Sequence, residues 1–204
     1  MSIDIAALRA GLARVAAAME RDFEELNAAD GALGDGDLGV TLTRGMRAIM
    51  DTADDLPDDL GRALLACAQA FTKASGSSYG TLMATGLMAI AKQVKGDTTL
   101  DPARMPELVA TARDQMQARG KAELGGKTVL DSLDAVAAAT AGTTDPADLA
   151  DAAVNAADTA LDAFRDRRAT VGRARIFGDK SVGLDDPGML AMARIVRALA
   201  DCER

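Results

Sequence analysis

Residues 145–168 read Asp145-Pro-Ala-Asp-Leu-Ala-Asp-Ala-Ala-Val-Asn-Ala-Ala-Asp-Thr-Ala-Leu-Asp-Ala-Phe-Arg-Asp-Arg-Arg168. Proline directly after Asp145 suits the first position of a helix, where a missing N–H costs nothing, so a long helix is expected here. This segment is rich in small apolar residues and poor in aromatic ones, and so is the whole chain, which is 49% hydrophobic but only 2% aromatic. Small apolar residues suit close helix–helix packing better than sheets, which favour β-branched and aromatic residues. The predicted fold class is therefore all-α.

Apolar residues recur at helical spacing almost throughout the 204 residues. We expect about eight helices, no strand and a single domain over residues 1–204. The expected helices cover residues 2–19 with Ser2 as the cap, 40–50, 59–73 with Asp58 or Asp59 as the cap, 81–95, 102–119, 129–139 with Thr128 as the cap, 146–168, and 187 to near the C-terminus. Short connections between such helices predict an antiparallel up-and-down bundle.

Charge and composition exclude several classes of protein. A net charge of -8 argues against a nucleic-acid surface, which needs a basic stripe. The chain has no run of about 18 apolar residues, and residues 1–19 carry Asp4, Arg9 and Arg14. We therefore expect neither a membrane span nor a secretion signal, and a cytoplasmic protein.

Cysteine and histidine usage narrows the chemistry further. Cys67 and Cys202 show no paired-ligand spacing, so neither zinc nor a disulfide is indicated, and Cys67 is expected to be a small core residue. There is no histidine anywhere in the chain. Histidine-dependent triads, histidine metal ligands and a phosphohistidine relay are therefore excluded within this chain.

Four connections are rich in glycine and carry the side chains best suited to chemistry: residues 30–39, 74–80, 120–128 and 172–188. The connections 51–59 and 141–145 are ordinary polar turns. In an up-and-down bundle, alternate connections share one end, and each glycine-rich connection precedes an even-numbered expected helix. The sequence therefore predicts that all four meet at one rim and form one site.

The first of these connections reads Asp30-Gly-Ala-Leu-Gly-Asp35-Gly-Asp37-Leu-Gly39. Three carboxylates this close repel one another, and Mg²⁺ relieves the repulsion because it takes oxygen ligands and bridges them to phosphates. A solvated acidic turn is the alternative. A calcium-binding EF-hand loop is disfavoured, because its ligand ladder fails whether it starts at Asp30 or at Asp35. Gly39 and Thr41 follow at an expected helix start, where free N–H groups favour anions.

The other three connections add features that suit a phosphate. Residues 74–80, Ala-Ser-Gly-Ser-Ser-Tyr-Gly, let the backbone approach phosphate oxygens, although such turns are common and this one is no Walker A loop. Residues 120–128 offer lysines and a capping hydroxyl, or simply a helix end and a turn. Arg173 could clamp a phosphate or lie free on the surface, and residues 186–188 form a rigid helix start. Together with the acidic connection, they favour a metal–phosphate site.

The same residues resemble a known family, the nucleotide-binding L subunit of dihydroxyacetone kinase, also called the DhaL or DAK2 domain family. The matching motifs are Asp30-x4-Asp35-Gly-Asp37-x-Gly, Ala74-Ser75-Gly76-x-x-Tyr79-Gly80-Thr81, Arg119-Gly-Lys-Ala-Glu, Gly126-Lys-Thr-x-x-Asp131, Gly172-Arg-Ala, Gly178-x-x-Ser-x-Gly and Asp186-Pro-Gly188. They occur in order over nearly the whole chain, and their combination is specific.

The resemblance implies an eight-helix antiparallel barrel that binds ADP or ATP at one rim. It implies two Mg²⁺ ions held by Asp30, Asp35 and Asp37, which together with Arg173 would be the catalytic residues. The residues implied to contact the nucleotide are Leu38, Gly39, Thr41, Ala74, Ser75, Gly76, Gly120, Thr128, Val129, Arg173, Asp186, Pro187 and Gly188.

The resemblance also implies a division of labour. In this family, a histidine of a separate K subunit or domain holds the ketone substrate, and a chain without histidine is consistent with the other half. The phosphoryl donor would be exchangeable ATP, or a phosphotransferase-system phosphoprotein that rephosphorylates tightly bound ADP, and a free-standing chain favours the second. The expected activity is Mg²⁺-dependent phosphoryl transfer to dihydroxyacetone or a related ketose, dependent on that partner. The sequence leaves open whether the chain forms a homodimer.

Two positions depart from the family pattern. Leu38 stands where histidine is usual, and Thr41 stands where asparagine is common. The metal ligands remain, so phosphoryl transfer is still expected, but the substrate could be another ketose such as erythrulose. The alternatives are an ADP-binding regulatory subunit, the helical domain of a fatty-acid kinase, and a helical scaffold without a ligand.

Overall fold

The computed structural model describes residues 2–201, and these form nine α-helices and three short 3-10 helices without a β-strand. The α-helices are α1 Ile5–Arg21, α2 Phe23–Leu33, α3 Leu38–Met50, α4 Leu60–Ala74, α5 Ser78–Gln93, α6 Met105–Gly120, α7 Val129–Thr140, α8 Pro146–Arg165 and α9 Pro187–Ala200. The 3-10 helices are η1 Ala53–Asp55, η2 Pro102–Arg104 and η3 Arg173–Ser181. The predicted all-α class is confirmed.

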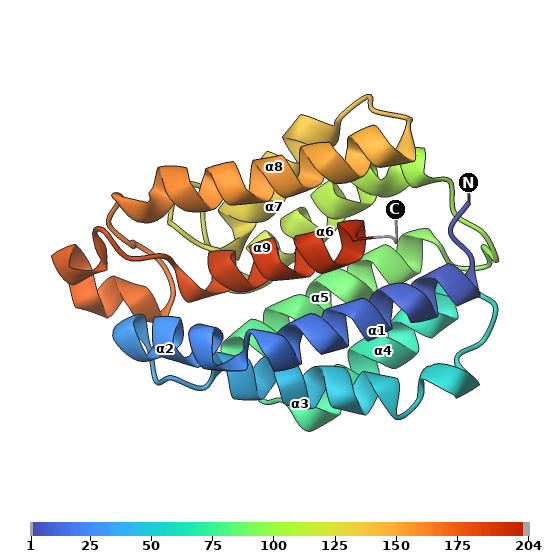
Figure 1. The fold of residues 1–204 in the computed structure, drawn as a ribbon, viewed down its shortest axis with the longest axis horizontal. Coiled ribbons are helices and arrows are strands. Elements are labelled where there is room, and N and C mark those ends of the chain that lie inside the picture. The colour runs from blue at the N-terminus through green and yellow to red at the C-terminus, as the bar shows by residue number, and fades with distance from the viewer. Residues whose placement is uncertain (1, 202–204) are drawn as a thin grey trace.

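Eight of the helices form a closed series of packing contacts. Helix α1 packs on α3, each helix from α3 to α8 packs on the next, and α9 returns to α1. Consecutive helices of this series run in alternating directions along the long axis of the molecule (Figure 1). Helix α2 contacts α3, α9 and η3 at the end where α1 finishes. The alternation places the connections before α3, α5, α7 and α9 at that same end.

The core is built from aliphatic and small side chains, as the composition predicts. Ala63, Ala157 and Ala191 have no exposed surface, which lets neighbouring helices approach closely. Cys67 is also fully buried and free, and burial raises the pKa of its thiol to about 11. It is a core residue as expected, while Cys202 lies outside the described residues.

Side-chain caps set most helix starts. Asp59, Thr128 and Asp186 cap α4, α7 and α9, which confirms those predictions. Thr128 belongs to a capping box in which Asp131 accepts from the Thr128 backbone N–H. The prediction of Ser2 as the first cap was wrong: the Asp4 side chain accepts the Ala7 N–H at 2.9 Å, so α1 begins later.

Several expected elements differ from the structure: α3 and α5 begin at Leu38 and Ser78 rather than at residues 40 and 81, and α6 begins at Met105, after η2, rather than at residue 102. Helix α2 was not foreseen, and it places Asp30 in its last turn, so the acidic connection is only residues 34–37. Its apolar residues Leu26 and Leu33 are almost fully buried, and this tertiary burial outweighs the glycine at position 31. The expected loop 172–188 contains η3, and α8 ends at Arg165 rather than near residue 168. None of the described helices is long and apolar enough to cross a membrane.

Candidate functional site

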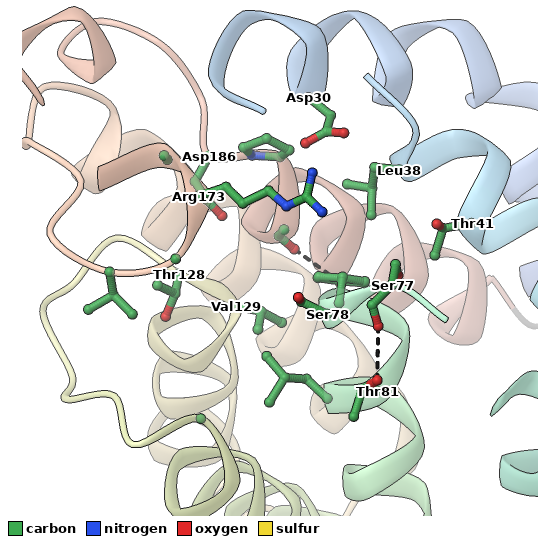
Figure 2. A pocket seen from close by; sticks show the side chains of 18 of the residues that line it. Asp30, Leu38, Thr41, Ser77, Ser78, Thr81, Thr128, Val129, Arg173 and Asp186 are labelled. Atoms are coloured by element: carbon green, nitrogen blue, oxygen red, sulfur yellow. Dashed lines mark hydrogen bonds between the residues drawn. The ribbon is translucent and has the colours of Figure 1, made fainter. Parts of the chain in front are cut away.

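A pocket of about 530 Å³ opens at the end of the bundle where α2 and η3 lie, and all four glycine-rich connections line it. The prediction that they meet at one rim is confirmed. Figure 2 shows Asp30 and Leu38 on one side, Arg173 and Asp186 on another, and Ser77, Ser78 and Thr81 on a third. Residues from α2, α3, α5, α6, α7, η3 and α9 therefore surround one space.

The three carboxylates of the acidic motif converge in this pocket. Asp30 comes from the last turn of α2, Asp35 from the connection, and Asp37 precedes α3. One oxygen of each lies within 4.8 Å of those of the other two. The Asp37 N–H donates to Asp30 Oδ2 at 2.9 Å, and a side chain on Gly34 would place its Cβ 2.4 Å from Asp30 Oδ1. The tight turn therefore needs glycine and holds the carboxylates together.

This cluster fits a hard divalent cation. All three groups offer carboxylate oxygens, the ligands that Mg²⁺ prefers, and the exposed Asp35 and Asp37 leave room for water and phosphate ligands. The Arg173 guanidinium reaches across from η3 and forms an ion pair with Asp35, and Figure 2 shows it pointing toward the acidic side. Opposite charges at the mouth are thus provided by two segments distant in sequence.

The start of α5 forms a second wall with an anion-binding character. The Ser77 hydroxyl caps the helix by accepting the Gly80 N–H at 3.0 Å, and the Thr81 hydroxyl donates to the Ser77 carbonyl at 2.9 Å. Helix N-termini favour negative charge. Gly76 has an ordinary φ, and no atom lies within 4 Å of where its Cβ would be. Neither backbone conformation nor packing demands glycine there, so its missing side chain leaves open space in the pocket.

A third wall is the start of α9. The buried Asp186 carboxylate accepts the Met189 N–H at 2.9 Å, and burial raises the pKa of Asp186 to about 7. The Tyr79 hydroxyl of α5 donates to the Gly188 carbonyl at 3.2 Å and so joins two pocket walls. Burial and the charge of Asp186 raise the pKa of Tyr79.

Most of the sequence-predicted site residues lie together. The predicted residues that line the pocket are Asp30, Asp35, Asp37, Leu38, Thr41, Gly76, Gly120, Thr128, Val129, Arg173, Asp186, Pro187 and Gly188. Gly39, Ala74 and Ser75 are not among its lining residues. The predicted roles of all these residues in binding stay predictions.

The three outliers have local structural explanations. The Gly39 N–H donates to Asn27 Oδ1 at 2.8 Å, and the Val40 N–H is 3.3 Å from the same oxygen. The Thr41 N–H donates to the Asp37 carbonyl at 2.8 Å. The expectation of free N–H groups at Gly39 and Thr41 was therefore wrong. Ala74 ends α4 facing solvent, and Ser75 is buried with its hydroxyl 3.4 Å from that of Ser77.

Sequence reasoning did not single out the apolar part of the lining. Leu82 and Met116 line the pocket together with the predicted Leu38 and Val129, and Leu82 packs against the buried cluster that contains Met116 and Val129. The signal available was position, because Leu82 begins one expected helix at the rim and Met116 ends another there. Asn27 was missed as well, because its partners lie on another helix. The expectation that Lys127 offers a cation to a phosphate was wrong, because its buried ammonium donates to three backbone carbonyls.

A family model described as the DAK2 domain matches residues 32–201. The chain belongs to the DAK2 domain family. It is 29% identical to the ADP-binding subunit DhaL of a PEP-dependent dihydroxyacetone kinase from Listeria innocua, over 91% of this chain and 90% of that protein. It is 34% identical to the triokinase/FMN cyclase of Bos taurus and 31% identical to an L-erythrulose 1-kinase of Mycolicibacterium smegmatis, each over 87% of this chain. Its homologues are thus kinases.

The chain spans about one third of the triokinase and of the erythrulose kinase, 32% in each case. A similar solved structure is also about three times as long as this chain. The dihydroxyacetone kinase from C. freundii, crystallised with AMP-PNP and Mg²⁺, matches with a TM-score of 0.75 and 25% identity, over 95% of this chain and 33% of that one. The all-helical fold is therefore that of the DAK2 domain.

Proposed function

We propose that this chain, as a single domain over residues 1–204, is the nucleotide-binding part of a kinase for dihydroxyacetone or a related short ketose. The observation that carries the proposal is the convergence of three carboxylates, Arg173 and the start of α5 on one open pocket. A relative of nearly equal length is named an ADP-binding subunit, and the C. freundii structure contains AMP-PNP and Mg²⁺. Both support a Mg²⁺–nucleotide ligand for this pocket.

The side chains divide the work among the walls. Asp30, Asp35 and Asp37 would hold two Mg²⁺ ions, which when bound neutralise and orient the phosphoryl oxygens. Arg173 stabilises negative charge at the mouth, and the α5 N-terminus adds its positive dipole end. The apolar lining that includes Leu38 and Val129 excludes water around the base and sugar of the nucleotide.

The substrate would be held by a partner. Phosphoryl transfer to a ketose needs a site for the sugar, and the resemblance to the L subunit assigns that site to a histidine-bearing K subunit, which this histidine-free chain cannot replace. The Listeria relative is named PEP-dependent, which supports a phosphotransferase-system phosphoprotein as the donor and ADP as a retained group. The erythrulose kinase supports a wider range of ketoses.

The decisive experiment uses the purified chain and a K subunit. We expect ADP to be retained through purification and released on denaturation, where chromatography identifies it. Adding the K subunit, a phosphoprotein donor or ATP, and a panel of ketoses should then give sugar phosphate. Absence of ADP–Mg²⁺ binding at millimolar concentration would overturn the proposal. Tight ADP binding without turnover on any ketose would instead favour the regulatory subunit.

A further inference from the structure

The most deeply buried charge among the described residues belongs to Lys127, which has no exposed surface. Its ammonium donates three hydrogen bonds, all to backbone carbonyls: Arg165 at 2.8 Å, Arg167 at 3.0 Å and Ser181 at 2.7 Å. An ammonium has three N–H donors, so each one has a partner. The side chain therefore links the start of α7 to three backbone positions elsewhere in the chain.

Two of the three acceptors, Arg167 and Ser181, belong to one segment, residues 166–186, which we call the arm, and the third, Arg165, immediately precedes it. Arg165 ends α8, and Ser181 ends η3. Lys127 therefore bonds the chain where the arm begins and again after Arg173. The Thr170 N–H donates to the Gly126 carbonyl at 3.2 Å, beside Lys127. On the other side of Lys127, Thr128 and Val129 begin α7 and line the pocket. Lys127 thus joins two pocket walls from behind.

The arm has few buried apolar contacts: Ala169, Ala174 and the neighbouring Phe177 pack with Leu33 in a small cluster, and Ile176 is 78% exposed. Besides Lys127, polar contacts hold it: Arg165 forms an ion pair with Asp185 at 2.7 Å, and the Gly183 N–H donates to the Arg165 carbonyl at 2.9 Å. Ser181 adds polar support, since its hydroxyl accepts the Ala169 N–H at 2.9 Å and donates to the Gly178 carbonyl at 2.6 Å. A segment with so few buried apolar contacts depends on its hydrogen bonds for a fixed conformation.

The position also carries a local cost. Lys127 has a φ of 61°, in the left-handed region that is uncommon and strained for residues other than glycine. Burying an ammonium costs more unless it is fully hydrogen-bonded. Both costs are offset only while all three carbonyls stay in place, so the energy of the side chain depends on the position of the arm.

We propose that Lys127 is a positioning residue: it fixes the arm against the start of α7 and so sets Arg173 opposite Asp35 across the pocket. This inference rests on the proposed function only for its effect on nucleotide binding. The structural half, that Lys127 orders the arm, holds for the ligand-free chain.

The first test measures the arm in the ligand-free protein. Trypsin can cut after Arg173, Arg175 and Lys180, all exposed. Lys127→Met removes the three side-chain hydrogen bonds to these carbonyls, and we expect cleavage in the arm to be at least about tenfold faster. Val94→Ala, at a fully buried position of an apolar cluster outside the pocket, is the control for a general loss of stability. Equal cleavage in the two variants would overturn the proposal.

The wild-type chain provides a test that does not need the variant to fold. Acetylation of the native protein should modify the exposed Lys121 and Lys180 rapidly and leave Lys127 at least about tenfold slower, because its ammonium is buried and fully bonded. Modification of Lys127 at the rate of Lys180 in the folded protein would overturn the proposal.

The second test asks whether the effect reaches the pocket. We expect Lys127→Met to weaken ADP–Mg²⁺ binding about tenfold, and Arg173→Ala added to it to weaken binding little further, since both act through one group. In melting temperature the two changes should add. Additive effects on affinity would overturn the positioning role. If the wild type binds no ADP, the proposed function fails, and the cleavage test alone then decides whether Lys127 orders the arm.

Discussion

The two ends of the bundle are built from the same kind of helix but differ in what they bury. At the far end, where the chain begins (Figure 1), Leu60, Val94, Leu100 and Leu108 are buried together, and Ile3 pairs with Leu100 through two backbone hydrogen bonds of 2.8 Å. At the pocket end the chain buries Lys127 and Asp186 and leaves three carboxylates facing open space. Apolar burial at the far end stabilises the fold. At the pocket end, the polar groups lower the folding stability, and we attribute them to the binding of a ligand.

Glycine shows the same contrast. At Gly61, a Cβ would lie 2.5 Å from the Ala91 carbonyl oxygen, so the missing side chain lets α4 pack on α5. At Gly76 a Cβ would meet nothing within 4 Å. One glycine serves the protein's own packing, and the other leaves space for another molecule.

The largest expected effect comes from removing two carboxylates of the acidic cluster, and the same change at the far end is its control. Asp35→Asn with Asp37→Asn removes metal ligands, and we expect ADP–Mg²⁺ affinity to fall at least about 1,000-fold, measured by calorimetry. Asp54→Asn with Asp55→Asn makes the same charge change at the exposed pair in η1. Its affinity should equal that of the wild type. Equal affinities in both double variants would mean that the acidic cluster is only a solvated turn.

The second effect is on the pH dependence of stability. The folded-state pKa of Asp186, about 7, lies above the value of 3.8 taken for the unfolded chain, because burial disfavours the charge. The folded state therefore binds this proton more tightly, and the stability it contributes is present below pH 3.8 and is lost as the pH rises through 7. Between pH 5 and pH 7, the wild type should lose about 2 kcal/mol relative to Asp186→Asn.

Denaturant unfolding at several pH values measures this difference. Asparagine is as good a cap as aspartate, so Asp186→Asn keeps the start of α9. Asp145→Asn is the far-end control, since that capping carboxylate is exposed at the start of α8. A wild type that follows the pH profile of Asp186→Asn would show that the buried carboxylate is charged throughout this range.

The contrast between the ends also explains what the sequence could predict. Caps such as Asp59 and Thr128 are local signals, and they located α4 and α7 correctly. The alternation of helices then brought four distant connections to one pocket without any knowledge of contacts. Family motifs supplied the individual pocket residues.

What failed depended on tertiary contacts. Helix α2 was missed because burial of Leu26 and Leu33 outweighs a glycine that reads locally as a loop. The N–H groups of Gly39 and Val40, which follow Asp37, donate to Asn27, which is 12 and 13 residues away and lies on α2. The three acceptors of Lys127 lie 38, 40 and 54 residues away, and no spacing rule connects them.

The smallest expected effect separates a cap that supports only its helix from one that also supports the pocket. Ser77 caps α5 at the pocket and Asp145 caps α8 at the far end, and each alanine substitution should cost about 1 kcal/mol of unfolding free energy. The consequences differ with ligand. Fraying at Ser77 disorders the start of α5, which lines the pocket, so ADP–Mg²⁺ should raise the melting temperature less in Ser77→Ala than in Asp145→Ala, corresponding to roughly two- to fivefold weaker binding. Equal ligand-induced shifts would place the nucleotide away from the start of α5, because a helix end that touches the ligand cannot loosen without cost to binding.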